Sequence, residues 1–360
     1  MTSYKSQEVE MDRILAKVLE ADASDLHLHA GKPPLIRVDS KLTPISGYTT
    51  LDDQELEKLV NVLLTDAQKL LLQEKKQLDF SYSFKGHARF RINVYFQKGT
   101  IAAALRHIPA KIRTLEELSL PKELEVFVEA RQGLVLFVGP TGHGKSTSLA
   151  AMLDIINHTR SEHIITVEDP IEYVFAQDKA LISQREVYLD TMSFAAAIGA
   201  SLREDPNVLM VGEMRDLDSI ATTITVAETG HLVFATLHTN DASQSIDRIV
   251  DVFPSHQQNQ VRSQLASVLL GVVSQRLLPR VGGGRIPAVE ILMTSTAVKN
   301  VIREARTYEI PNIIHTSTDA GMVSLEKSLS DLVRKGLVKV EDALTYANNK
   351  ELLRSLVKRF

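Results

Sequence analysis

One eight-residue segment constrains the fold most strongly: residues 139–146 read GPTGHGKS and fit the pattern G-x-x-x-x-G-K-[ST]. The segment follows a short apolar stretch, Leu134 to Val138, and precedes a stretch with helical character. Strand, glycine-rich loop and helix in this order are the setting of a phosphate-binding loop. Glycines let the backbone curl so that N–H groups point at a β-phosphate, and the following helix N-terminus adds partial positive charge.

Two side chains of this loop have specific predicted roles. Lys145 is expected to reach the β- and γ-phosphates of ATP, and Ser146 is expected to donate a hydroxyl ligand to Mg2+. A plain glycine turn between strand and helix is the alternative, and it leaves both residues unexplained. The predicted nucleotide contacts are Gly139, Pro140, Thr141, Gly142, His143, Gly144, Lys145, Ser146 and Thr147.

Further short apolar stretches follow the loop, at Ile164–Val167, Val208–Val211 and Leu232–Ala235. Helical segments separate them, and strands that are buried on both faces and alternate with helices indicate a parallel sheet. We therefore predict an α/β core over residues 121–294. A mostly helical region is predicted for residues 295–360.

Carboxylates stand at the ends of two of these strands. The segment ITVEDPIEY, residues 165–173, contains Glu168, Asp169 and Glu172, and the segment NVLMVGEMRD, residues 207–216, contains Glu213. Ligands bind beyond the carboxyl ends of strands in open α/β sheets. Glu172 and Glu213 are the candidates for catalysis, with Glu213 acting on Mg2+ through water. Asp169 has an alternative role as a turn cap before Pro170.

Two histidines, His231 and His238, flank the last of these strands. His238 comes at its carboxyl end, near the expected position of the γ-phosphate. A sensor that hydrogen-bonds the phosphate or a catalytic carboxylate is one interpretation. A satisfied structural histidine is the other.

Residues 1–110 follow a different pattern. Apolar residues at helical spacing predict a helix over 8–20, alternation predicts strands near Leu26–Leu28 and Leu35–Val38, and residues 51–75 are predicted to be helical. A hairpin is predicted from His87, with its turn at Lys98–Gly99 and one basic face. The N-terminal domain is therefore predicted to be α/β around an antiparallel sheet, followed by a linker over 111–120.

Arginines lie on or just after this hairpin: Arg89, Arg91, Arg106 and Arg113. Charge on one face of a half-exposed sheet is usually solvated. The functional interpretation is that Arg106 and Arg113, which lie nearest the linker, close over ATP and stabilise the transferred phosphoryl group.

Composition removes several other classes of function. The chain has 360 residues and no cysteine, which excludes disulfides, thiolate zinc sites and cysteine nucleophiles. A net charge of -4, 5% aromatic residues and no tryptophan argue against a nucleic-acid motor. Neither a signal peptide nor an apolar stretch of ~18 residues is visible, so a cytoplasmic protein is expected.

With these motifs in place, the chain resembles the secretion ATPase superfamily, and within it the type IV pilus retraction ATPases. The matching segments, in the family's order, are SDLHLHAG and PPLIRVD at 24–39, GPTGHGKST at 139–147, ITVEDPIEY at 165–173, LREDPNVLMVGEMRD at 202–216 and TGHLVFATLHTNDA at 229–242. The segment AVKNVIRE at 297–304 is similar to a motif of retraction enzymes but differs from it at Val298, Lys299 and Val301. His143 stands where these enzymes usually have a small residue.

The resemblance implies a PAS-like N-terminal domain and a RecA-like core, with ATP and Mg2+ as cofactors. It makes Glu172 the catalytic glutamate, Glu213 the Walker B glutamate, His231 and His238 the His-box residues, and Arg106 and Arg113 the interdomain arginines. It also implies a ring hexamer at the cytoplasmic face of the inner membrane, with a pilus platform protein, pilin and a paralogous motor as partners. An assembly or accessory ATPase and a non-hydrolysing subunit are the alternatives.

Overall fold

The computed structural model describes residues 2–38, 41–86, 88–108 and 111–358, and divides into two compact units. The first unit comprises residues 1–111 and the short segment Pro170–Val174, and the second comprises 112–169 and 175–360. The segment 170–174 was not expected in the first unit. The predicted boundary at residue 110 lies outside the described residues. Residues 295–360, predicted as a separate region, belong to the same unit as the phosphate loop.

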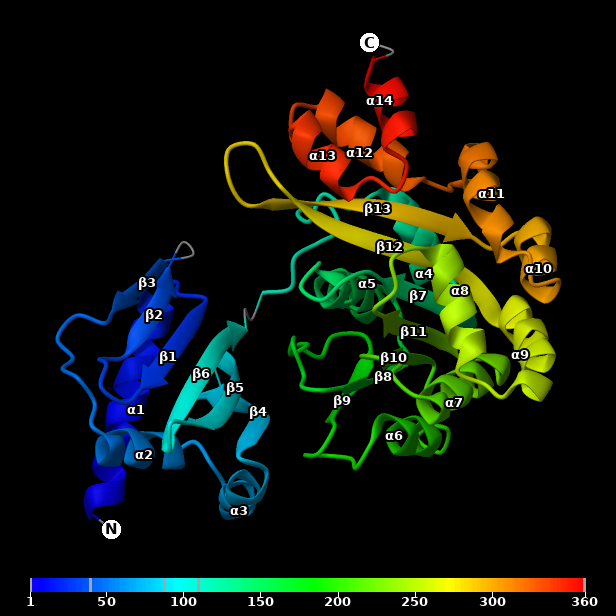
Figure 1. The fold of residues 1–360 in the computed structure, drawn as a ribbon. Coiled ribbons are helices and arrows are strands. Elements are labelled where there is room, and N and C mark those ends of the chain that lie inside the picture. The colour runs from blue at the N-terminus through cyan, green and yellow to red at the C-terminus, as the bar shows by residue number, and fades with distance from the viewer. Residues whose placement is uncertain (1, 39–40, 87, 109–110, 359–360) are drawn as a thin grey trace. The chain divides into compact units, whose positions relative to one another are not determined.

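The N-terminal unit is built on an antiparallel sheet of six strands, in the order β3-β2-β1-β6-β5-β4 (Figure 1). One face of the sheet is buried: Leu26, Phe90 and Leu105 pack in one core with Ile14 of the first helix and Leu56 of the second. The elements are α1 (Thr2–Glu20), β1 (Asp25–His29), β2 (Leu35–Val38), β3 (Lys41–Pro44), α2 (Asp53–Asn61), α3 (Asp66–Lys75), β4 (Gln77–Phe84), β5 (Ala88–Gln97) and β6 (Thr100–Ile108).

The predicted hairpin is β5–β6. Phe90 and Ile92 are buried while Arg89 and Arg91 alternate with them on the more exposed face. The turn lies at Lys98 and Gly99, whose φ values are both positive (49° and 83°), as a two-residue turn of type I′ requires. His87, where the hairpin was expected to begin, lies outside the described residues. The antiparallel sheet and its basic face therefore follow the sequence pattern.

The prediction of one helix over 51–75 was wrong, because the structure has two. Asp52 caps α2 in a reciprocal capping box with Glu55, and Thr65 does the same for α3 with Gln68. The capping side chains accept the first free N–H groups of each helix, so a new helix starts at residue 66. The strands β3 and β4 were not predicted.

The second unit contains a sheet of seven strands, in the order β13-β12-β7-β11-β10-β8-β9. All neighbouring pairs from β12 to β9 are parallel. The last strand, β13, was not predicted and runs antiparallel to β12. The strands are β7 (Gly133–Val138), β8 (His163–Glu168), β9 (Leu181–Glu186), β10 (Val208–Val211), β11 (Leu232–Leu237), β12 (Leu269–Pro279) and β13 (Arg285–Met293).

Helices cover this sheet and account for the remaining elements of the unit. They are η1 (Lys122–Leu124), α4 (Glu125–Glu129), α5 (Lys145–Thr159), α6 (Phe194–Ser201), α7 (Leu217–Glu228), α8 (Ala242–Asp251), α9 (Ser255–Val268), α10 (Thr296–Arg303), η2 (Thr307–Glu309), α11 (Ile310–Thr316), η3 (Thr318–Ala320), α12 (Leu325–Arg334), α13 (Val340–Tyr346) and α14 (Lys350–Lys358). The strands β7, β10 and β11 are buried along their whole length, as their uninterrupted apolar sequences predict.

Two clusters of apolar side chains hold this unit together. The main core joins the strands to α6, α7, α8 and α9, for example through Leu136, Ile198 and Ile246. A smaller core joins Leu278 of β12 and Ile286 of β13 to the last three helices, which gather beside this hairpin in Figure 1. The β12–β13 hairpin therefore connects the parallel sheet to the C-terminal helices.

Candidate functional site

The phosphate loop connects β7 to α5 in the predicted manner. Three of its glycines have positive φ: 142° at Gly139, 77° at Gly142 and 82° at Gly144. A Cβ at Gly139 would lie 2.4 Å from the backbone oxygen of Gln275, so no larger residue fits there without a shift. Gly144 precedes α5 and offers no side-chain cap, so the first N–H groups of the helix are not capped by that residue. The loop thus has the curled backbone that an anion requires.

Lys145 is folded into this curl and is only 7% exposed. Its Nζ donates hydrogen bonds to the backbone oxygens of Gly139 at 2.7 Å and Pro140 at 3.1 Å. The same atom lies 3.4 Å from Nδ1 of His238. A buried ammonium held by carbonyl oxygens is ready to exchange these acceptors for phosphate oxygens.

His238 and Glu213 meet Lys145 at the carboxyl ends of β11 and β10. His238 Nε2 lies 3.0 Å from Oε1 of Glu213, and because a carboxylate only accepts, this nitrogen carries the proton. In the neutral ring Nδ1 is then an acceptor, and it faces both Lys145 Nζ and Oγ1 of Thr141 at 3.4 Å. The structure therefore brings together three predicted residues from three separate segments.

Arg215 holds Glu213 from the other side. Its Nη2 lies 2.7 Å from Oε2 of Glu213, and its Nη1 lies 3.9 Å from Oδ2 of Asp169 at the end of β8. Burial alone would raise the pKa of Glu213, but the hydrogen bonds from Arg215 and His238 and the positive charge of Arg215 outweigh it, so the pKa is lowered. Glu213 is thus ionised at neutral pH and suited to accept hydrogen bonds from the water ligands of a cation.

The other carboxylates of the ITVEDPIEY segment divide between the two units. Glu168 is buried and accepts hydrogen bonds from Oγ1 of Thr166 at 2.7 Å and Nε2 of Gln184 at 3.3 Å, a structural arrangement. Glu172 belongs to the segment 170–174 of the N-terminal unit, where its Oε1 lies 3.9 Å from Nη1 of Arg91. The catalytic role of Glu172 stays a prediction.

The two predicted arginines lie in different units. Arg106 is on the exposed face of the N-terminal sheet, and its Nε lies 3.0 Å from Oδ1 of Asp25. Its side chain is 71% exposed. Arg113 is exposed in the second unit, in the stretch that precedes η1. Their role at the nucleotide stays a prediction.

His231 lies at the amino end of β11, whereas His238 follows its carboxyl end. The strand has six residues, which at ~3.3 Å per residue separates the two histidines by roughly 20 Å. Nδ1 of His231 contacts Oγ1 of Thr229 and the backbone oxygen of Val226. The structure does not bring His231 to the phosphate loop of this chain.

Several residues around the loop were missed by the sequence analysis. Gln275 of β12 is 2% exposed, and it donates from Nε2 to the backbone oxygen of His143 at 2.8 Å and accepts from Oγ of Ser148 at 2.8 Å. Arg285 donates to the backbone oxygen of Gly142 at 3.2 Å. Arg215 could have been predicted, because it lies in the segment NVLMVGEMRD that also contains Glu213. Gln275 and Arg285 lie far along the chain, and nothing in their local sequence marks them.

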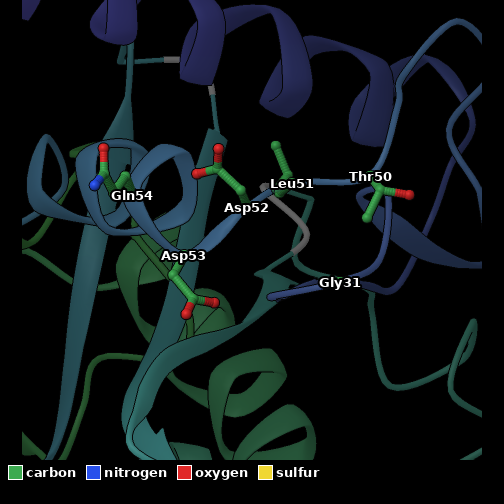
Figure 2. A pocket seen from close by; sticks show the side chains of 6 residues that line it. All are labelled: Gly31, Thr50, Leu51, Asp52, Asp53 and Gln54. Atoms are coloured by element: carbon green, nitrogen blue, oxygen red, sulfur yellow. The ribbon is translucent and has the colours of Figure 1, made fainter.

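A surface pocket in the N-terminal unit is unsuited to a nucleotide. It is lined by Gly31, Thr50, Leu51, Asp52, Asp53 and Gln54 (Figure 2). Two carboxylates and no basic side chain face it, so phosphates would be repelled. The side chain of Asp52 is already used as the cap of α2.

Comparison with known proteins identifies the family. Residues 5–283 match the family model described as type II/IV secretion system protein. The chain belongs to this family. It is 44% identical over 335 residues to the Pseudomonas aeruginosa type IV pilus retraction ATPase PilT, covering 93% of this chain and 97% of that protein. It is 37% identical over 351 residues to the type IV pilus ATPase PilU of the same species, covering 97% and 92% of the two chains.

Solved structures give the same result. A crystal structure of the pilus retraction motor PilT with bound ADP is similar with a TM-score of 0.89 at 44% identity, and the match covers 96% of this chain and 98% of that one. The ATPase DotB of Legionella pneumophila is similar with a TM-score of 0.78 at 26% identity, over 94% and 95% of the two chains. The predicted family and fold class are therefore confirmed. Among the described residues, no helix is long and apolar enough to cross a membrane.

Proposed function

We propose that this chain is a Mg2+-dependent ATP hydrolase that powers type IV pilus retraction as a ring hexamer. The observation that carries the proposal is the position of Lys145, folded into the phosphate loop and facing the His238–Glu213 pair. The names of its similar proteins, a pilus retraction ATPase and a pilus ATPase, support the pilus as the machine it serves.

The residues present fit a bound nucleotide. Phosphate oxygens would replace the backbone oxygens of Gly139 and Pro140 as acceptors of Lys145, and N–H groups of the loop would complete the cradle. Among the described residues, no three His, Asp or Glu side chains converge to hold a metal ion. A magnesium ion beside Ser146 would therefore take most of its ligands from phosphate and water, as this cation commonly does.

The proposed chemistry is attack of water on the γ-phosphorus, with cleavage of its bond to the bridging oxygen of ADP. Glu172 takes the proton of the attacking water, and Glu213 orients water beside the phosphates. His238, whose Nε2 lies beside Glu213 and whose Nδ1 lies beside Lys145, links the two residues and adjusts when the phosphate acceptors change. Magnesium, when bound, neutralises charge on the β- and γ-oxygens. Arg106 and Arg113 supply further positive charge to the transferred group.

The partners and location follow from the same proposal. The hexamer acts at the cytoplasmic face of the inner membrane through a pilus platform protein, and pilin subunits leave the fibre as a result. An accessory retraction ATPase that works beside a paralogous motor is a second candidate. The chain is also 37% identical to a second type IV pilus ATPase, PilU, over 97% of its length.

The first experiment measures phosphate release by the purified full chain. Activity should require Mg2+, and Glu172→Gln should lower it on the order of 100- to 10,000-fold while ADP still binds. Glu116→Gln, at an exposed glutamate outside the site, is the matched control and should stay at the wild-type rate. Unchanged hydrolysis in Glu172→Gln would refute the assignment of the base.

The second experiment tests the biological role in the organism that encodes the chain. A deletion strain should be hyperpiliated and unable to twitch, and only the chain with an intact Glu172 should restore motility. Bald cells would indicate an assembly motor instead. Normal twitching would indicate the accessory role.

A further inference from the structure

The side chain of His143 contacts the β12–β13 hairpin. Its Nδ1 accepts a hydrogen bond from the backbone N–H of Leu277 at 3.0 Å, while its own backbone oxygen accepts from Nε2 of Gln275 at 2.8 Å. Next to it, the backbone oxygen of Gly142 accepts from Arg285 at 3.2 Å. Three hydrogen bonds thus join two consecutive loop residues to one hairpin.

The imidazole of His143 must be neutral to make its contact. Because the Leu277 N–H is a donor, Nδ1 must be an acceptor and the ring proton must be on Nε2. Burial lowers the pKa of His143, and the charges of Arg276, Lys145 and Arg285 lower it further. These are the charged groups that face the ring from β12, α5 and β13, and together they keep the acceptor available at neutral pH.

The other neighbour of the ring comes from the C-terminal helices. Tyr346, at the end of α13, has its ring centroid 6.2 Å from that of His143, with 59° between the ring planes. Tyr346 also packs against the smaller core, which contains Leu278 and Ile286 of the hairpin. The same imidazole therefore contacts the hairpin by a hydrogen bond and the C-terminal helices by its ring.

We infer that His143 is a positioning residue that fastens the phosphate loop to β12 and to Tyr346, so that nucleotide affinity depends on the docking of the C-terminal helices. The inference rests on the proposed binding of nucleotide at this loop. A small residue at position 143 would have neither the acceptor nor the ring, so it would lack the direct contacts with Leu277 and Tyr346. His143 touches no reacting atom in this scheme and acts only through the backbone of the loop.

The test is a set of affinity measurements with a fluorescent ADP analogue on the full chain at pH 7.5. His143→Ala should weaken binding by about 2- to 10-fold, the range of one net hydrogen bond. His143→Asn should restore most of the affinity, because its side-chain oxygen takes the place of Nδ1. His158→Gln, an exposed histidine of α5 outside the loop, is the control and should bind as the wild type does.

Two further readouts separate positioning from a general loss of structure. Tyr346→Leu should weaken binding in the wild-type background and have no additional effect in His143→Ala, because the coupling passes through the ring. Between pH 7.5 and pH 5 the wild type should lose more affinity than His143→Asn, because the pKa of His143 lies below 6.5 and protonation converts the Nδ1 acceptor into a donor.

The outcomes distinguish the two proposals. Absence of nucleotide binding by the wild type would overturn the proposed function. If the wild type binds nucleotide, any of three results would overturn this inference alone. They are full affinity in His143→Ala, no rescue of affinity by His143→Asn, and equal effects of Tyr346→Leu on affinity in the wild-type and His143→Ala backgrounds.

Discussion

Replacing Gly139 with alanine tests whether the phosphate loop is held from behind by β12. The backbone at Gly139 has φ of 142°, which L-residues rarely adopt. The added Cβ would lie 2.4 Å from the backbone oxygen of Gln275 and 3.4 Å from Nη1 of Arg276. The nearer neighbour is backbone within a paired strand, so it cannot rotate away as a flexible side chain would.

Both effects carry a cost in the free energy of unfolding. An unfavourable φ costs about 1–3 kcal/mol, and overpacking in a filled site costs about another 1–3 kcal/mol. We therefore expect Gly139→Ala to destabilise the second unit by about 2–6 kcal/mol. Gly142→Ala is the matched control, because its φ of 77° is also unfavourable but a Cβ there meets nothing within 4 Å. That variant should lose only about 1–2 kcal/mol.

The assay is calorimetric unfolding of both variants without nucleotide. The transition of the second unit is identified as the one that added ADP raises, because a ligand stabilises the unit that binds it. At roughly 2–4 °C per kcal/mol for a domain of this size, the two variants should differ in Tm by several degrees. Equal shifts would refute the reasoning, because the contact with Gln275 would then impose no constraint on the loop.

Two further predictions concern carboxylates of the same unit. Burial raises the pKa of Glu290 to about 7. Between pH 4.5 and pH 7 the folded state therefore keeps a proton that the unfolded state has released. The contribution of this carboxyl group to the free energy of unfolding falls as pH rises through that range. Glu290→Gln should therefore match the wild type near pH 4 and exceed it by about 3 kcal/mol at pH 8, measured by urea unfolding; an equal difference at both pH values would contradict this. Glu213→Gln should raise the Mg2+ concentration for half-maximal hydrolysis by roughly 10- to 100-fold, with ADP binding in EDTA little changed. An unaltered Mg2+ titration would remove Glu213 from the metal's surroundings.

Local sequence patterns predicted the phosphate loop and the meeting of two neighbouring strand ends. The glycines at 139, 142 and 144 and the lysine that follows are contiguous, so one pattern contains the whole curl. Glu213 and His238 follow adjacent parallel strands, and parallel strands end at one edge of the sheet. His231 precedes the same strand that His238 follows, so it lies at the opposite edge of the sheet. The sequence analysis treated both histidines as one motif and did not take this separation into account.

The support of the loop could not be predicted in this way. Gln275 lies 132 residues from its partner His143, and β12 carries Ser274, Gln275 and Arg276 in a run that does not resemble a buried strand. Burial of these polar side chains is possible because each donates a hydrogen bond to a backbone oxygen of a neighbouring loop, either at His143 or at Asn240. Only the folded chain brings these loops to the strand. The two helices at 53–75 could have been predicted. The capping box that starts α3, Thr65 with Gln68, is local in the sequence and was overlooked.

The same hairpin also holds the loop that follows His238. Ser274 and Arg276 each donate to the backbone oxygen of Asn240 at 2.7 Å, and Glu290 accepts from the backbone N–H of Ala242 at 3.1 Å. Alternate residues of β12 therefore hold two loops: Gln275 and Leu277 hold the phosphate loop, and Ser274 and Arg276 hold the loop after β11. Because both loops take their position from one strand, a displacement of the hairpin would move Lys145 and His238 together and preserve their contact. Substitutions in the hairpin should for this reason change nucleotide affinity and hydrolysis in parallel, whereas substitutions of Glu213 or Glu172 should change hydrolysis alone.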